Sequence, residues 1–177
     1  MHSFFYTLDH TISAWFYGLR SEAGISIFKF LTLFGSTTFI ILFAILLALY
    51  LMWQKRYGLL AYFVGGLVVN EALVFLLKIL VQRPRPLLAV IPEADFSFPS
   101  GHAAAALFFF GFLIWYATKN IYSPLWRSTT RIISLALIIL IPISRLYLGE
   151  HYLTDVLASV CLAGAILLMV IKRADLA

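Results

Sequence analysis

Residues 37–53 read TTFIILFAILLALYLMW, a run without a single charged side chain. A transmembrane helix needs about 17 to 25 mostly apolar residues. Four further stretches have a similar composition: 59–81, 103–117, 132–148 and 152–171. Backbone polar groups in lipid must be bonded within their own segment, which favours helices over isolated strands. The sequence therefore predicts an all-α, polytopic transmembrane helical bundle with about five spans.

The composition of the chain supports this prediction. Of 177 residues, 63% are hydrophobic and 12% are charged, and the mean hydropathy is +0.97. Soluble domains are about half apolar and about one quarter charged. The same numbers exclude intrinsic disorder, and the single cysteine excludes a disulfide framework and a cysteine-rich zinc site. We expect one membrane-embedded domain over residues 1–177, with its transmembrane core at 36–172.

The first 35 residues differ from the rest. Between Phe4 and Leu19, apolar residues recur at helical spacing with polar residues between them, which predicts an amphipathic helix in the membrane interface. Residues 25–34 are apolar but few, and they include Lys29, so we expect a re-entrant piece there. The sequence leaves open whether residues 1–35 cross the bilayer or follow further N-terminal sequence.

Basic residues in the loops predict the orientation of the spans. One side of the predicted bundle carries Lys55, Arg56, Lys119, Arg127, Arg131, Lys172 and Arg173. By the positive-inside rule this side is cytoplasmic, so the other faces the periplasm or the cell exterior, as in a bacterial inner membrane protein. These positions account for the net charge of +5 without a nucleic-acid partner.

Polar and titratable side chains gather on the outer side, where charges beside lipid are costly and therefore indicate function. Three of them, Lys78, Arg85 and Arg145, are cations, and guanidinium groups match phosphate oxygens in pairs. Ser100 and Gly101 begin the third span, where free N–H groups favour an anion. The pattern predicts a phosphate-binding site.

Two histidines complete this group. His151 and Asp155 are four residues apart, on one helix face, and a carboxylate beside an imidazole orients it as a nucleophile. His102, on another helix, can protonate a leaving oxygen. Taken singly, each residue has a structural explanation, such as a helix cap or an ion pair in the bundle. Together they indicate phosphoryl transfer.

Three segments resemble the three signatures of the type 2 phosphatidic acid phosphatase superfamily. They are KILVQRPRP at 78–86, PSGH at 99–102 and SRLYLGEHYLTD at 144–155. The order and the internal spacing both agree with that family. The resemblance implies a helical bundle and a mechanism that needs neither a metal nor a cofactor.

The resemblance also implies a role for each signature residue. His151 attacks phosphorus and forms a phosphohistidine, Asp155 orients His151, and His102 protonates the leaving group and then activates water. The phosphate oxygens are held by Lys78, Arg85, Ser100, Gly101 and Arg145. Arg83 lies outside the signature, and we expect at most an electrostatic role for it.

We therefore predict an integral membrane lipid phosphatase that releases inorganic phosphate, with undecaprenyl diphosphate as the favoured substrate. Two alternatives remain open. A lipid phosphotransferase would use the same residues, and a non-catalytic binder or transporter of lipid phosphates would use the cations alone. The bilayer and its lipid phosphates are the expected partners, and the sequence does not specify an oligomeric state.

Overall fold

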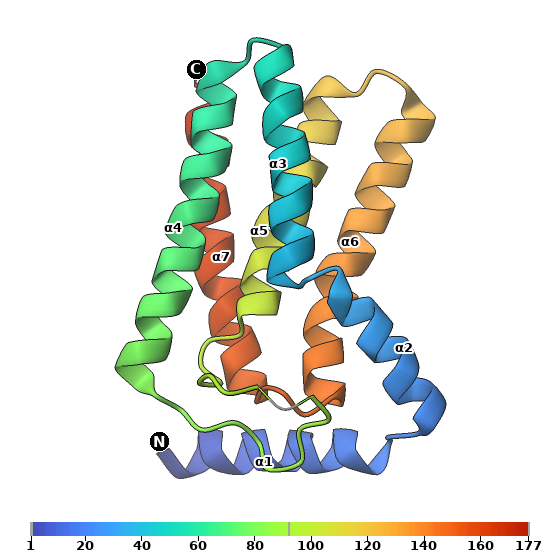
Figure 1. Ribbon diagram of the computed structural model, residues 1–177, viewed down its shortest axis with the longest axis vertical. Helices are drawn as coiled ribbons and strands as arrows, with labels where there is room; N and C mark the ends of the chain where they lie inside the picture. Colours follow the sequence, from blue (N-terminus) through green and yellow to red (C-terminus); the bar gives the residue numbers. More distant parts are fainter. Residues whose placement is uncertain (1, 92, 177) are drawn as a thin grey trace.

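A computed structural model describes residues 2–91 and 93–176, which form seven α-helices (Figure 1). They are α1 (His2–Gly18), α2 (Glu22–Leu33), α3 (Thr37–Trp53), α4 (Tyr57–Val81), α5 (Gly101–Asn120), α6 (Pro124–Tyr147) and α7 (Leu153–Ala174). Five segments of the described chain are long and apolar enough to cross a membrane: α2 with α3, and each of α4 to α7. The predicted all-helical transmembrane bundle with five spans is confirmed.

Helix α5 forms the centre of the bundle and packs against α3, α4, α6 and α7. Its first turns carry four buried alanines, Ala103 to Ala106, and such small side chains let neighbouring helices approach closely. Further along, Phe108, Phe109 and Phe112 are buried against Phe63 of α4. The end of α5 that begins at Gly101 is therefore held firmly among its neighbours.

Helix α1 lies across one end of the bundle, beneath the loop that joins α4 to α5 (Figure 1). Its exposed aromatic side chains include Phe4, Phe5, Tyr6 and Trp15. Asp9, by contrast, is 1% exposed and faces the bundle. This placement is compatible with the predicted interfacial helix, which stays a prediction.

Helix α2 packs on α6 and leads into α3 through a short turn at residues 34–36. Ser21 and Ser36 cap α2 and α3, since their hydroxyls accept hydrogen bonds from the N–H groups of Gly24 and Phe39. Residues 22–53 together have the length and composition of a candidate span, with a bend at residues 34–36. The re-entrant piece expected over residues 25–34 stays a prediction. Two capped helices in series supply the length that α3 alone barely reaches.

Candidate active site

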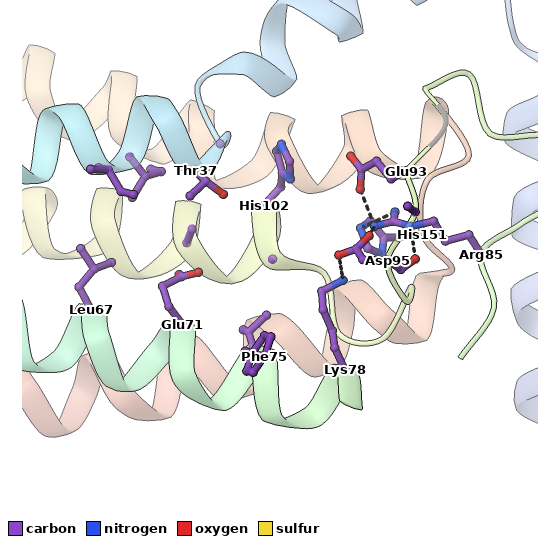
Figure 2. Close-up of a pocket in the computed structure, with 17 residues that line it drawn as sticks. Thr37, Leu67, Glu71, Phe75, Lys78, Arg85, Glu93, Asp95, His102 and His151 are labelled. Carbon is purple, nitrogen blue, oxygen red and sulfur yellow. Dashed lines mark hydrogen bonds and ion pairs between the residues drawn. The ribbon is translucent and has the colours of Figure 1, made fainter. Parts of the chain in front are cut away.

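A cavity of about 610 Å³ lies between α3, α4, α5 and the loop that joins α4 to α5. Lys78, Arg85, Gly101, His102 and His151 all line it. Figure 2 shows Lys78, Arg85 and His151 together at one end of the cavity, and Thr37, Leu67 and Glu71 toward the other. Residues far apart in the sequence therefore meet in one place.

His151 owes its position to the tight turn between α6 and α7. Gly149 has a φ of +72°, and a Cβ there would lie 2.2 Å from the Arg20 side chain and 3.0 Å from the Leu88 carbonyl oxygen. Only glycine suits this backbone and this space. The turn leaves His151 almost fully buried, with its ring at the cavity wall.

The hydrogen bonds of His151 define its tautomer. Its Nδ1 lies 2.6 Å from the carbonyl oxygen of Ser97, which can only accept, so Nδ1 carries the hydrogen. Nε2 then carries a lone pair, and it lies 3.3 Å from Nη1 of Arg85. The imidazole thus presents its unprotonated nitrogen beside the guanidinium group of Arg85.

Asp155 lies close to His151 without making the hydrogen bond expected from the spacing. Its Oδ2 is 3.7 Å from Nδ1 of His151 and accepts from the N–H of Tyr152 at 2.8 Å. Its Oδ1 accepts from Arg83 at 2.7 Å. The proton of Nδ1 goes to Ser97, so Asp155 contributes its negative charge and not the bond that fixes the tautomer.

The environment of His151 disfavours its protonated form. Burial lowers its pKa, the charges of Arg145 and Arg85 lower it further, and Asp155 opposes them, with a result of about 4. The ring is therefore neutral at physiological pH. A neutral imidazole is the form that can attack phosphorus.

The three predicted phosphate-binding cations converge on two carboxylates of the α4–α5 loop. Figure 2 shows Lys78 and Arg85 beside both of these carboxylates, Glu93 and Asp95. Glu93 bridges Arg85 and Arg145, and lies 2.8 Å from the latter. Asp95 bridges Lys78, at 2.8 Å, and Arg85. Contacts with these cations lower the pKa of Asp95 although its partial burial alone would raise it. The three cations thus pair with the carboxylate oxygens of this loop, which occupy positions where the oxygens of another anion would also be attracted.

Ser100, Gly101 and His102 form the beginning of α5. The hydroxyl of Ser100 is buried and has no hydrogen-bond partner among the described residues, although Ser100 is the N-cap. A Cβ on Gly101 would meet only Val74, at 3.9 Å, so space remains open there. These features suit an anion at the helix N-terminus.

The sequence did not indicate several residues that complete the site. Ser97 acts through its backbone carbonyl, which carries no signal in the sequence. Glu93 and Asp95 lie in an irregular loop. Glu150, beside His151, is buried, accepts a hydrogen bond from the N–H of Ile91 at 2.7 Å and has its pKa raised by that burial. Arg83, for which we expected at most an electrostatic role, forms an ion pair with Asp155 at 2.7 Å.

A model of the PAP2 superfamily matches residues 59–175. The chain belongs to the PAP2 superfamily. Phosphatidylglycerophosphatase B of Bacillus subtilis is 32% identical over 149 residues, which cover 82% of this chain and 72% of that protein. Dolichyldiphosphatase 1 of Rhinolophus ferrumequinum is 34% identical over 105 residues, or 54% of this chain and 44% of its own. The resemblance to this superfamily inferred from the three signatures is confirmed.

Solved structures share the fold. The transmembrane PAP2-type phosphatidylglycerolphosphate phosphatase of Bacillus subtilis superposes with a TM-score of 0.87 at 23% identity, over 96% of this chain and 85% of that one. LpxE of Aquifex aeolicus gives 0.71 at 22% identity, over 93% and 95%. This member of the PAP2 superfamily is an integral membrane phosphatase.

Proposed function

We propose that this PAP2 protein hydrolyses a phosphomonoester or diphosphate of a membrane lipid through a phosphohistidine on His151. The tautomer of His151 carries this proposal. Its Nδ1 donates to Ser97, and its free Nε2 lies beside Arg85 in the cavity shared with His102. A binder or transporter of lipid phosphates would have no use for a neutral, oriented imidazole.

The first chemical step forms a P–N bond. The lone pair of His151 Nε2 attacks phosphorus, and the bond from phosphorus to the leaving oxygen breaks as protonated His102 gives its proton to that oxygen. The phosphorylated imidazole is cationic, and its Nδ1–H keeps its bond to Ser97. The carboxylate of Asp155, 3.7 Å away, stabilises that positive charge.

The second step returns the enzyme to its resting state. His102 takes a proton from water, the oxygen attacks phosphorus, and the P–N bond breaks with its electrons returning to Nε2. Lys78, Arg85, Arg145 and the Ser100–Gly101 turn hold the phosphate oxygens during both steps. Neither step requires a metal ion or a cofactor, since the protein side chains supply the charge and the proton transfer.

The walls of the cavity suit a lipid chain. Away from the cations, it is lined by Ile40 and Ile41 of α3 and by Leu67 and Phe75 of α4. Two relatives are named for phosphatidylglycerophosphate and dolichyl diphosphate, both lipids with phosphate head groups. We favour undecaprenyl diphosphate, because a polyprenyl chain needs only apolar contacts and three cations match the charge of a diphosphate.

We further propose that the site faces the periplasm or the cell exterior of a bacterial inner membrane. The basic residues that end the spans at the opposite end of the bundle support this orientation, among them Lys55, Arg56, Lys119 and Lys172. In this arrangement residues 1–177 act as one membrane-embedded domain, and α1 rests in the outer interface.

The test uses purified protein in excess EDTA with a panel of lipid phosphates. We expect release of inorganic phosphate, fastest from undecaprenyl diphosphate, and a loss of at least about 1,000-fold in His151→Ala. Quenching in alkali, in which a P–N bond survives, should trap labelled phosphate on the wild type alone. Transfer of the label to a second lipid in place of water would show a phosphotransferase, and full activity of His151→Ala would exclude the mechanism.

A further inference from the structure

Arg83 and Arg85 are two residues apart but serve opposite sides of the catalytic histidine. Arg85 faces the cavity and contacts Nε2 of His151. Arg83 points away from that cavity, toward α1 and the first turn of α7. Gln82, which ends α4 in a left-handed conformation with φ of 50°, turns the chain at this point. Arg83 therefore lies behind His151 and is not one of the residues that line the cavity.

Arg83 holds both groups that flank Nδ1 of His151. Its side chain donates from Nη1 to Oδ1 of Asp155 at 2.7 Å. Its backbone carbonyl accepts from the N–H of Ser97 at 2.8 Å, and the carbonyl of Ser97 in turn accepts from His151. One residue thus fixes both the hydrogen-bond acceptor and the negative charge next to the imidazole.

Asp9 of α1 fixes Arg83 from the other side. Its Oδ2 accepts from Nη2 of Arg83 at 2.7 Å and from the hydroxyl of Thr154 at 2.6 Å. Its Oδ1 accepts from the N–H of Thr154 at 2.9 Å. A carboxylate that is 1% exposed would be costly without such partners. Three donors satisfy it here, two of them from the residue next to Asp155.

The guanidinium of Arg83 stays charged in this position. Burial alone would lower its pKa, but the hydrogen bonds and charges of Asp9 and Asp155 outweigh burial and raise it. The ring of Tyr152 covers one face, with its centre 4.1 Å from the guanidinium carbon. Arg83 is thus a fixed cation between two buried carboxylates.

We propose that Arg83 and Asp9 are positioning residues of this enzyme, whose side chains hold Asp155 beside His151 and so link catalysis to the docking of α1. This inference rests on the proposed function. When Nε2 bonds to phosphorus the imidazole becomes cationic, and only a correctly placed Asp155 stabilises it. Loss of Arg83 or Asp9 should therefore slow the chemical step and leave substrate binding intact.

The experiment compares Arg83→Gln, Arg83→Lys and Asp9→Asn with Arg20→Gln as a matched control. Arg20 also ties the N-terminal segment to the outer loops, through the carbonyls of Tyr147 and Leu88, but it does not contact Asp155 or Ser97. For Arg83→Gln and Asp9→Asn we expect kcat to fall about 10- to 100-fold, with KM changed less than about twofold. Arg83→Lys, which keeps the charge, should recover part of kcat.

The pH profile separates positioning from simple loss of structure. His151 is surrounded by Asp155, Glu150, Arg85, Arg145 and His102, and Arg83→Gln removes a positive charge behind this group. Protonation of His151 then becomes easier, so the acid limb of kcat/KM should move to higher pH. In Arg20→Gln the limb should stay in place, and thermal unfolding should show which variants are folded.

Two results would overturn the inference. One is an unchanged kcat in folded Arg83→Gln and Asp9→Asn. The other is an equal loss in these variants and in Arg20→Gln with no movement of the acid limb, which would indicate a structural role only. Failure of the proposed function is a separate observation, since wild-type activity would then survive His151→Ala. If Arg83→Gln does not fold, the near-isosteric Asp9→Asn decides the question.

Discussion

The imidazole of His151 donates from Nδ1 to the backbone carbonyl of Ser97 at 2.6 Å. A main-chain acceptor is fixed by the fold and has no pKa of its own in the working range. It orients the ring at every pH at which the protein is folded. The carboxylate of Asp155 is then free to act by charge, from 3.7 Å. This division of roles between Ser97 and Asp155 leads to the first prediction.

Asp155→Asn should reduce activity less than His151→Ala does. The Ser97 carbonyl still holds the reactive tautomer in this variant, and only the charge that stabilises the cationic intermediate is lost. We expect kcat to fall about 100-fold, against at least about 1,000-fold for His151→Ala, with KM nearly constant. Steady-state kinetics on both purified variants provide the measurement. Equal losses would show that Asp155 is needed for orientation as well.

The acid limb of the enzyme should lie well below the ordinary histidine value. Burial and the neighbouring Arg145 and Arg85 bring the pKa of His151 from 6.5 to about 4, so Nε2 is unprotonated above that pH and gains a proton only as the pH falls through it. We expect the acid limb of kcat/KM that belongs to His151, corrected for the second phosphate ionisation of the substrate near pH 6, to lie below about pH 5. A corrected limb near 6.5 would contradict this.

Removal of the loop carboxylates should strengthen anion binding. Glu93 and Asp95 lie on the cations that we assign to phosphate, so a substrate must displace them or share those cations with them. In Glu93→Gln with Asp95→Asn we expect the inhibition constant of inorganic phosphate to fall about tenfold. Glu22→Gln with Asp175→Asn, at two exposed acids far from the cations, is the control for the same change in total charge. A weaker affinity for phosphate in the double variant would refute competition.

Gly101→Ala should fold normally and bind phosphate poorly. The new methyl group meets only Val74 at 3.9 Å inside the protein, but it enters the space at the start of α5 where an anion would sit. We expect unchanged thermal stability and an inhibition constant for phosphate about tenfold higher, because close approach to the helix N-terminus is lost. Gly58→Ala, with no atom within 4 Å of the new carbon, is the matched control. Equal effects of the two substitutions would argue against an anion at Gly101.

The sequence predicted those parts of the site that depend on helix ends. Lys78, His102 and His151 lie near the ends of long apolar runs, and spans that alternate in direction bring such ends to a common side. The three signatures then indicated which residues from these helix ends belong to one site. A bundle of about five spans followed from hydropathy alone, because length and apolar composition suffice to define a span.

The remaining features depend on irregular backbone. Arg83 and Arg85 point in opposite directions from irregular backbone that follows the left-handed Gln82, and the acceptor for His151 is a main-chain carbonyl in the same loop region. Neither feature leaves a periodic pattern of residues in the sequence from which it could be predicted. The burial of Asp9 depends on how α1 docks, which a helical pattern of apolar residues does not define. Loop conformation, and not helix formation, was the missing information.

The bend between α2 and α3 has a consequence for the path by which a lipid reaches the cavity. Gly35 and Thr37, at this bend, line the cavity together with Ile41 and Phe75, and the last two are also 52% and 66% exposed on the flank of the bundle. Two apolar side chains therefore belong both to the cavity wall and to the outer flank formed by α3 and α4. Under the proposed function, a lipid that diffuses in one leaflet reaches the site from this flank, and its tail stays in the bilayer while its phosphate is transferred to water.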